Sequence, residues 1–215
     1  MNISLNQILE MPNAAILAKR LQSALQAEQE NRRHFYEIIE EDKKMEFING
    51  EIIFQSPAKL RHTNSIKLLT SLLSNFVIKH ELGFVGSEKM LVSLTRNDYE
   101  PDICFFDKLK SQSFKPEQMQ FPAPDIAVEV LSPSTEKYDR ETKFQDYAAH
   151  GIKEYWIVDA EHEIIEQYFL QNEAYELLLK AKDGTIESVV LPEFKIQIRA
   201  VFDEKLNLEE LKRMI

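Results

Sequence analysis

The sequence predicts an α/β protein, of the mixed α+β kind, with a mixed β-sheet core flanked by helices. Residues 125–131 form an apolar strand, residues 138–150 a helix and residues 155–159 a second apolar strand. This layout is typical of a right-handed crossover between two parallel strands. Asn49-Gly50 lies between two apolar runs and predicts an N-terminal β-hairpin. Antiparallel strands are expected toward the C-terminus, over 163–170, 174–180, 186–191 and 194–202.

Composition narrows the class of protein. The chain has 215 residues, 44% of them hydrophobic, which fits one principal domain. The single cysteine, Cys104, excludes an intramolecular disulfide and a cysteine-rich zinc cluster and fits a reducing compartment. No apolar run reaches the ~20 residues of a membrane span, and no signal-peptide layout begins the chain, so we expect a cytoplasmic protein without membrane contact. The net charge of −10 argues against a general nucleic-acid coat protein but not against a local basic cleft.

We expect a helical extension over residues 1–30 and a main domain over residues 31–215. The extension carries an apolar stripe at helical spacing, which suits a homodimer and packing on the same chain equally well. Apolar residues at 35–39 continue or restart a helix that packs on the main domain. The stripe consists of Ile16, Leu17, Leu21, Ala24 and Leu25.

Turn residues and spacing predict the remaining elements in order. The hairpin covers residues 45–54 and places Glu46 opposite Ile53. A helix follows over residues 59–79. Beyond it we expect a strand over 84–94, a turn at 95–98, a strand over 101–106, a polar loop over 107–124 and, after the crossover helix, a C′ stop at Gly151.

Glu129 stands in the middle of the apolar strand 125–131. An ionised glutamate removed from water costs several kcal/mol unless it takes up a proton, pairs with a cation or binds a metal. Alternation along the strand puts Asp125, Ala127, Glu129 and Leu131 on one face. Taken alone, Glu129 is as well explained by a salt bridge to Lys or Arg as by metal ligation.

Two other parts of the chain offer partners for Glu129. Metal-dependent phosphodiester cleavage needs at least two hard oxygen ligands and usually a basic group near the attacking water. Asp102 begins a predicted strand, and on a neighbouring strand at ~4.8 Å spacing it could share one ion with Glu129. Asp139, Lys143 and Tyr147 share one helix face, which could look back over the strand. The alternative for that face is an exposed ion pair beside a packed tyrosine.

These residues resemble the PD-(D/E)XK nuclease superfamily, and more closely its restriction-endonuclease-like Uma-two family. Pro101-Asp102 is followed after 26 residues by Glu129-Val130-Leu131. The resemblance covers roughly residues 35 to 200. Its further segments are EFINGEII from Glu46, Ser56-Pro57 with His62, EVLSPST from Glu129, the Asp139, Lys143, Tyr147 and Gly151 series, and EYWIVD from Glu154.

The resemblance implies a restriction-endonuclease-like core and cleavage of DNA that depends on Mg²⁺ or Mn²⁺. Asp102 and Glu129 would be metal ligands. Glu46 resembles the additional acidic ligand of many such nucleases, although a cross-strand surface residue explains it equally well. The leading hypothesis is therefore a metal-dependent endonuclease that hydrolyses phosphodiester bonds in DNA.

One position departs from the superfamily pattern, because Leu131 stands where the motif has lysine. A leucine can neither orient a water molecule nor stabilise charge. In this family the lysine is supplied from the following helix, which points to Lys143, with Lys137 in the turn as the fallback. His62 could contact phosphate or assist water, or be an ordinary polar residue at the rim.

Two other functions stay open. A catalytically inactive, nuclease-like module that binds DNA or protein would fit the charge of −10 and Leu131. A metal site acting on a smaller phosphodiester, such as a nucleotide, would fit the same ligands. The five histidines show no paired ligand spacing, so no zinc site is expected.

Overall fold

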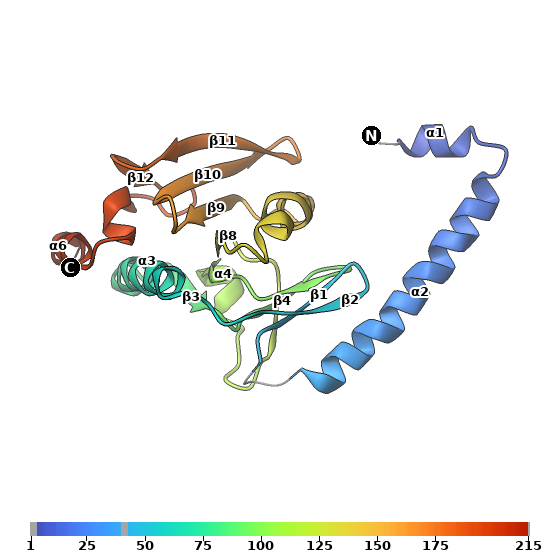
Figure 1. Cartoon of the computed structure of the whole chain (residues 1–215), viewed down its shortest axis with the longest axis horizontal. Coiled ribbons are helices and arrows are strands. Elements are labelled where there is room, and N and C mark those ends of the chain that lie inside the picture. Colours follow the sequence, from blue (N-terminus) through green and yellow to red (C-terminus); the bar gives the residue numbers. More distant parts are fainter. Residues whose placement is uncertain (1–3, 40–42, 215) are drawn as a thin grey trace.

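The computed structural model describes residues 4–39 and 43–214, and β8 (Ile126–Val130) lies at the centre of its main sheet (Figure 1). β8 pairs in parallel with β9 (Glu154–Asp159) and antiparallel with β6 (Ile103–Asp107). The predicted parallel crossover is therefore confirmed. The sheet order is β11 (Ala174–Ala181), β10 (Ile164–Gln171), β9, β8, β6 and β3 (Gly83–Ser87).

The N-terminal hairpin belongs to a second sheet. β1 (Met45–Ile48) and β2 (Glu51–Phe54) pair in the predicted register, with Glu46 opposite Ile53. Asn49 and Gly50 have φ values of 52° and 88°, as a type I′ turn requires and as Asn-Gly favours. The strands follow the order β2, β1, β5 (Asp98–Tyr99), β4 (Leu91–Ser93) and β7 (Gln120–Phe121).

Two predicted elements between the hairpin and β8 were wrong in extent. Residues 84–94 are not one strand, because the chain leaves β3 at Glu88, with a φ of 63°, and enters the second sheet as β4. The loop 107–124 contains α4 (Lys108–Ser111), whose first turn is capped by the Asp107 carboxylate, and β7. Alternation of apolar residues could not reveal that β3 and β4 belong to different sheets, because strands of both sheets show the same alternation.

The C-terminal prediction also needs correction. β10 and β11 are antiparallel as expected, but β12 (Thr185–Glu187) and β13 (Lys195–Gln197) form a separate small sheet. The predicted strand 194–202 ends early, in a 3₁₀ turn at Ile198–Val201. The helix α6 (Glu204–Met214), which the sequence reasoning did not include, then packs near α3 (Leu60–Lys79).

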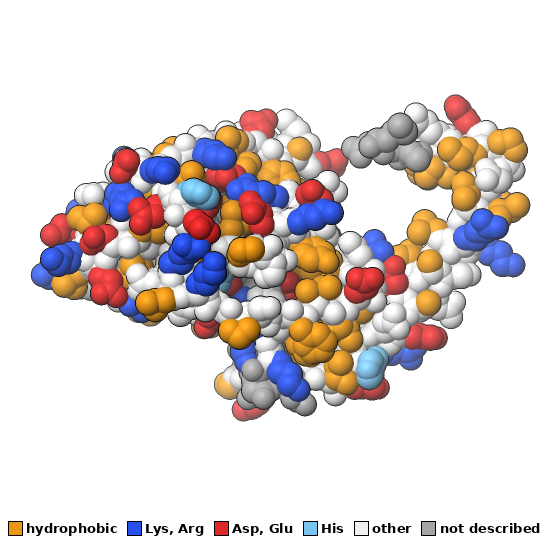
Figure 2. All heavy atoms as spheres, in the orientation of Figure 1, with side chains coloured by type: hydrophobic (Ala, Val, Ile, Leu, Met, Phe, Trp, Pro, Cys, Tyr) orange, Lys and Arg blue, Asp and Glu red, His pale blue; other side chains and the backbone are white. Residues whose placement is uncertain are grey.

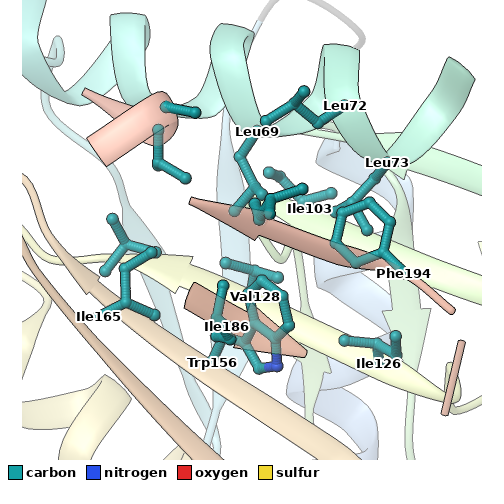
Figure 3. Close-up of a cluster of buried hydrophobic side chains, with 14 of the residues drawn as sticks. Leu69, Leu72, Leu73, Ile103, Ile126, Val128, Trp156, Ile165, Ile186 and Phe194 are labelled. Atoms are coloured by element: carbon teal, nitrogen blue, oxygen red, sulfur yellow. The ribbon is translucent and has the colours of Figure 1, made fainter. Parts of the chain in front are cut away.

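The main core lies between α3 and one face of the sheet. Ile126, Val128 and Val130 point into it, whereas Ala127 lies in the cluster on the opposite face, as the alternation predicted. Figure 3 shows leucines of α3 meeting the sheet residues in this core. Burial of each such side chain contributes about 1.5–3 kcal/mol, so this face of the sheet holds much of the core, and alternation turns Glu129 to the opposite face. The labelled residues include Leu69, Leu72, Leu73, Ile103, Val128, Trp156 and Phe194.

The crossover helix is present over the predicted residues, but its first part is wider than an α-helix. Residues Tyr138–Lys143 are π-helical, and α5 (Phe144–Ala149) continues them. Gly151 follows with a φ of 72°, in its predicted role as the C′ residue. π-helical segments are rare and occur frequently at functional sites.

The N-terminal extension is an arm made of α1 (Leu5–Leu9) and α2 (Ala14–Ile38). α2 runs without interruption through residue 30, where the extension was expected to end. Its C-terminal end is anchored by Phe35, which packs on Phe47, while its N-terminal part stands away from the body (Figure 1). Within the described residues, no helix is long and apolar enough to cross a membrane.

Candidate active site

Asp102 and Glu129 lie next to each other at one edge of the β6–β8 pair. Ile103 is opposite Val128, so Asp102, one residue before β6, falls level with Glu129. The Asp102 Oδ2 atom accepts a hydrogen bond of 2.8 Å from the backbone N–H of Val130. Asp102 and Glu129 are 4% and 2% exposed. The strand adjacency expected for a shared site is thus present.

Lys143 lies at the centre of a buried carboxylate cluster. Its Nζ atom is 2.9 Å from Glu46 Oε1, 3.0 Å from Glu129 Oε1 and 3.2 Å from Asp139 Oδ1. The lysine side chain is 1% exposed, so these contacts exclude bulk water. Side chains from the N-terminal hairpin, the central strand β8 and the crossover helix therefore meet at the ammonium group of Lys143.

The structure decides several alternatives that the sequence left open. Asp139 and Lys143 are buried, so they are not the exposed ion pair that the helix face could have held. The Tyr147 hydroxyl donates a hydrogen bond of 2.7 Å to Glu129 Oε1. Glu46 is 1% exposed and is not a surface residue of the hairpin. Lys137 is exposed, which leaves Lys143 as the lysine of the cluster.

Asp102 has two basic neighbours of its own. Lys44 Nζ lies 2.7 Å from Asp102 Oδ1, and His62 Nε2 lies 3.5 Å from Asp102 Oδ2. The sequence reasoning placed His62 near the site but missed Lys44. The signal was available, because Lys44 precedes Glu46 by two residues and an extended chain directs both side chains to the same face.

Burial and charge shift the ionisation of this cluster in opposite directions. Burial, reinforced by the neighbouring carboxylates, raises the pKa of Glu129 to about 8, although Lys143 opposes the shift. Burial also pushes the pKa of Asp102 upward, but Lys44 and His62 outweigh it and hold that pKa below its usual range. Burial lowers the pKa of Lys143, yet Glu129, Glu46 and Asp139 raise it well above the ordinary value. Burial therefore favours the protonated form of Glu129, whereas the basic neighbours of Asp102 favour its ionised form and the carboxylates around Lys143 favour its charged form.

A pocket of about 280 Å³ opens beside these groups. Asp102, Glu129 and Lys143 line it, whereas Glu46 lies behind Lys143 and is not part of the wall. Leu131 also lines the pocket, so the position without the motif lysine does face the site. The rim carries polar and basic groups, among them Ser56, Lys59, Arg61, His62, Ser132, Ser134 and Thr135.

Among the described residues, no three His, Cys, Asp or Glu side chains are arranged ready to hold a metal. The reason is visible in the contacts: Lys143 and Lys44 occupy the oxygen atoms that a cation would need. The donor chemistry nevertheless fits a hard divalent ion, because Asp102 and Glu129 present carboxylate oxygens to one pocket. Four buried carboxylates share two lysines here, which leaves excess acidity for a cation to neutralise: Glu46, Asp102, Glu129 and Asp139.

Fold and site together define a restriction-endonuclease-like protein with buried acidic residues and a lysine at the edge of a mixed sheet. A family model described as "Uma2: Putative restriction endonuclease" matches residues 32–199. The chain belongs to this Uma2 family. The family places the protein among nuclease-like proteins, which agrees with the resemblance seen in the sequence.

Two of the proteins that resemble the chain are a Synechocystis protein and an Anabaena protein of solved structure. The uncharacterized protein slr1290 of Synechocystis sp. is 29% identical over 142 residues, which cover 64% of this chain and 72% of that protein. A crystal structure described as a putative nuclease belonging to DUF820, from Anabaena variabilis, superimposes with a TM-score of 0.68 at 19% identity. The match covers 80% of this chain and 96% of that one, and it shows that the two share a fold.

Proposed function

We propose that the protein hydrolyses phosphodiester bonds in DNA with Mg²⁺ or Mn²⁺ bound by Asp102 and Glu129. The observation that carries the proposal is the convergence of Asp102, Glu129 and Lys143 on one pocket from three separate elements. These are the residue types and positions that the family resemblance implies. Two carboxylates and a lysine that line one pocket match the requirements of metal-assisted phosphoryl chemistry.

Each residue has a distinct role in this proposal. A bound ion supplies Lewis acidity and neutralises charge on the phosphate oxygens. Lys143 keeps its proton, because its pKa is raised, so it orients water or stabilises negative charge and does not act as a base. Glu46 holds Lys143 in place and joins the ligand set only when the lysine turns away. His62, at the rim, faces the phosphate.

The rim supports a polyanionic substrate despite the acidic chain. Lys59 and Arg61 line the pocket at the N-terminal end of α3, where the helix dipole and free N–H groups favour phosphate. Arg61 lies 2.6 Å from Glu161, and that exposed pair opens at little cost when a phosphate competes for the guanidinium. In this proposal the DNA backbone binds to the basic rim of the pocket, so the net charge of −10 of the whole chain does not argue against DNA binding.

The experiment is a nicking assay on supercoiled plasmid and short duplex or branched DNA with Mg²⁺, with Mn²⁺ and with EDTA. We expect ion-dependent nicking that is lost in Asp102→Asn, Glu129→Gln and Lys143→Met. Asp125→Asn is the matched control, because Pro124-Asp125 repeats the Pro-Asp dipeptide and Asp125 is a buried carboxylate paired with Lys110 and Lys153 outside the pocket. Cleavage that persists in Glu129→Gln, or no cleavage on any of these DNAs, contradicts the proposal.

A second function is favoured by one observation. Leu131 lines the pocket where a lysine is expected, and Lys143 is already saturated by carboxylates, so the site would also suit a nuclease-like module that binds without cleaving. Calorimetric titration with Mg²⁺ or Mn²⁺ separates the two. A catalytic site binds the ion and loses the heat in Asp102→Ala, whereas a binding module retains DNA in EDTA and never cleaves it.

A further inference from the structure

Lys44 covers one oxygen atom of Asp102 at the candidate metal site. Its Nζ atom lies 2.7 Å from Asp102 Oδ1. The other oxygen atom, Oδ2, accepts a hydrogen bond of 2.8 Å from the backbone N–H of Val130 and lies 3.5 Å from His62 Nε2. Both oxygen atoms of Asp102 are therefore engaged, and Oδ1 is engaged by a positively charged group that a second cation would have to replace.

The two lysines of the site are held very differently. Lys143 Nζ lies within 3.2 Å of three carboxylates, and its side chain is 1% exposed. In the described part of the chain, Lys44 forms an ion pair with Asp102 only, and its side chain is 20% exposed. Moving Lys143 would leave Glu46 and Asp139 buried without their counter-charge, which is costly. Moving Lys44 uncovers only an oxygen atom of Asp102, so Lys44 is the lysine that a cation can replace at the lower cost.

A divalent ion and the ammonium group of Lys44 compete for the same carboxylate. If both bound Asp102, like charges would lie within a few ångströms of each other in a largely buried site, where such repulsion is strong. We propose that Lys44 is an ion-displaced lysine, which neutralises Asp102 until a divalent cation binds and then turns to the edge of the pocket to bind a phosphate oxygen of the substrate. This inference rests on the proposed function, because it takes Asp102 as a ligand of the ion.

The hairpin determines where the displaced ammonium group can go. The backbone N–H of Gln55 donates a hydrogen bond of 3.1 Å to the carbonyl of Lys44, so the backbone of Lys44 is held and only its flexible side chain turns. Gln55 lines the pocket, and Lys59 and Arg61 line it as well. The ammonium group of Lys44 would therefore add a positive charge beside the basic rim. Binding of the ion and binding of phosphate would then favour each other.

Calorimetric titration with Mn²⁺ tests the competition. We expect Lys44→Gln to bind the ion about 10-fold or more tightly than the wild-type protein, because the competing charge is gone. Lys110→Gln is the matched control, since it removes an ammonium group 3.1 Å from the buried Asp125, outside the pocket, and should leave the affinity unchanged. Adding Asp102→Asn to Lys44→Gln should abolish the heat, which would locate the ion at Asp102. Circular dichroism verifies that the variants fold.

Amine acetylation followed by mass spectrometry tests the movement in the unaltered protein. We expect saturating Mn²⁺ to raise the acetylation rate of Lys44 several-fold, because its ammonium group leaves Asp102. Lys143 should stay protected with and without the ion, since its three carboxylates keep it buried. Sodium chloride at matched ionic strength controls for screening.

Fluorescence anisotropy with a labelled DNA duplex tests the contact with phosphate. With Ca²⁺, another cation that prefers oxygen ligands, Lys44→Gln should bind the duplex several-fold more weakly than the wild-type protein. In EDTA, where Lys44 pairs with Asp102, the two proteins should bind it equally. Equal affinity with Ca²⁺ overturns the proposed contact with phosphate.

The outcomes separate this inference from the proposed function. If Mn²⁺ binds the wild-type protein while Lys44 stays protected, or if Lys44→Gln binds the ion no more tightly, the inference is overturned and the metal site stands. Equal tightening in Lys110→Gln also overturns the inference, because the effect would then follow from net charge. If neither the wild-type protein nor Lys44→Gln binds the ion, the metal-dependent function is overturned together with the inference.

Discussion

Replacing Lys143 by methionine tests the electrostatics of the site most directly. The substitution keeps a long unbranched side chain but removes the ammonium group that lies 2.9–3.2 Å from Glu46, Glu129 and Asp139. Removing one partner of a buried ion pair costs about 3–5 kcal/mol, because the remaining charge stays buried without compensation. The raised pKa of Glu129 offsets part of this cost, because a proton taken up by Glu129 removes one of the unpaired charges.

The assay is thermal and urea unfolding of Lys143→Met beside Lys180→Met. A loss of about 3–5 kcal/mol corresponds to roughly 6–20 °C in melting temperature for a chain of this size. Lys180 also pairs with a buried carboxylate, at 3.1 Å from Glu166, but its side chain is 54% exposed and Glu166 keeps Arg140. The control should therefore lose no more than about 1 kcal/mol. Equal stability of the two variants would refute the reasoning.

A divalent ion should partly replace the missing ammonium. In Lys143→Met the carboxylates lose the cation that occupies their oxygen atoms, so Mg²⁺ or Mn²⁺ should raise the melting temperature more than in the wild-type protein. Sodium chloride at matched ionic strength controls for general screening. An identical response of the two proteins would mean that the ion does not bind at this cluster.

Three further predictions follow from the same contacts. Folding raises the pKa of Glu129 from about 4.5 to about 8. The stabilisation due to its proton is therefore complete below pH 4.5 and is lost as the pH rises through 8. In Glu129→Gln, the stability measured by urea unfolding should change less with pH over this range. Tyr147→Phe removes the hydroxyl that donates to Glu129 and should cost about 1–2 kcal/mol in the same assay, and no loss would contradict the hydrogen bond's contribution. Phe35→Ala empties the packing against Phe47 and should cost about 3–5 kcal/mol while making α2 more accessible to protease; unchanged digestion would show that Phe35 does not anchor the arm.

The sequence could predict the two carboxylates of the site because their signals are local. Glu129 interrupts an apolar strand, and its face follows from alternation alone. The crossover of β8 and β9 follows from a strand, a helix and a strand in succession. The position of Asp102 beside Glu129 could be predicted only on the condition that their two strands are neighbours, because strand order depends on contacts between residues far apart in the chain.

The parts that could not be predicted depend on tertiary contacts. The break at Glu88 sends β3 and β4 to different sheets, and no spacing of apolar residues encodes that choice. Lys44 was overlooked because an isolated lysine before a strand is usually solvated. Alternation places the Lys44 side chain on the same face as that of Glu46, but its contact with Asp102 depends on the pairing of β1 with β5, which brings the hairpin beside the residues preceding β6.

The position of Lys143 explains how the chain can carry Leu131 and still assemble a lysine at the site. On β8, residue 131 follows the strand at the pocket wall, whereas the crossover helix returns above the same wall and supplies an ammonium group from there. The π-helical turn at Tyr138–Lys143 brings Asp139 and Lys143 inward together, so the lysine arrives with one of its own counter-charges. Moving the lysine from strand to helix therefore leaves the ammonium within reach of Glu129 while freeing the strand position for an apolar side chain. The catalytic hypothesis therefore depends on Lys143 in place of the motif lysine that Leu131 replaces.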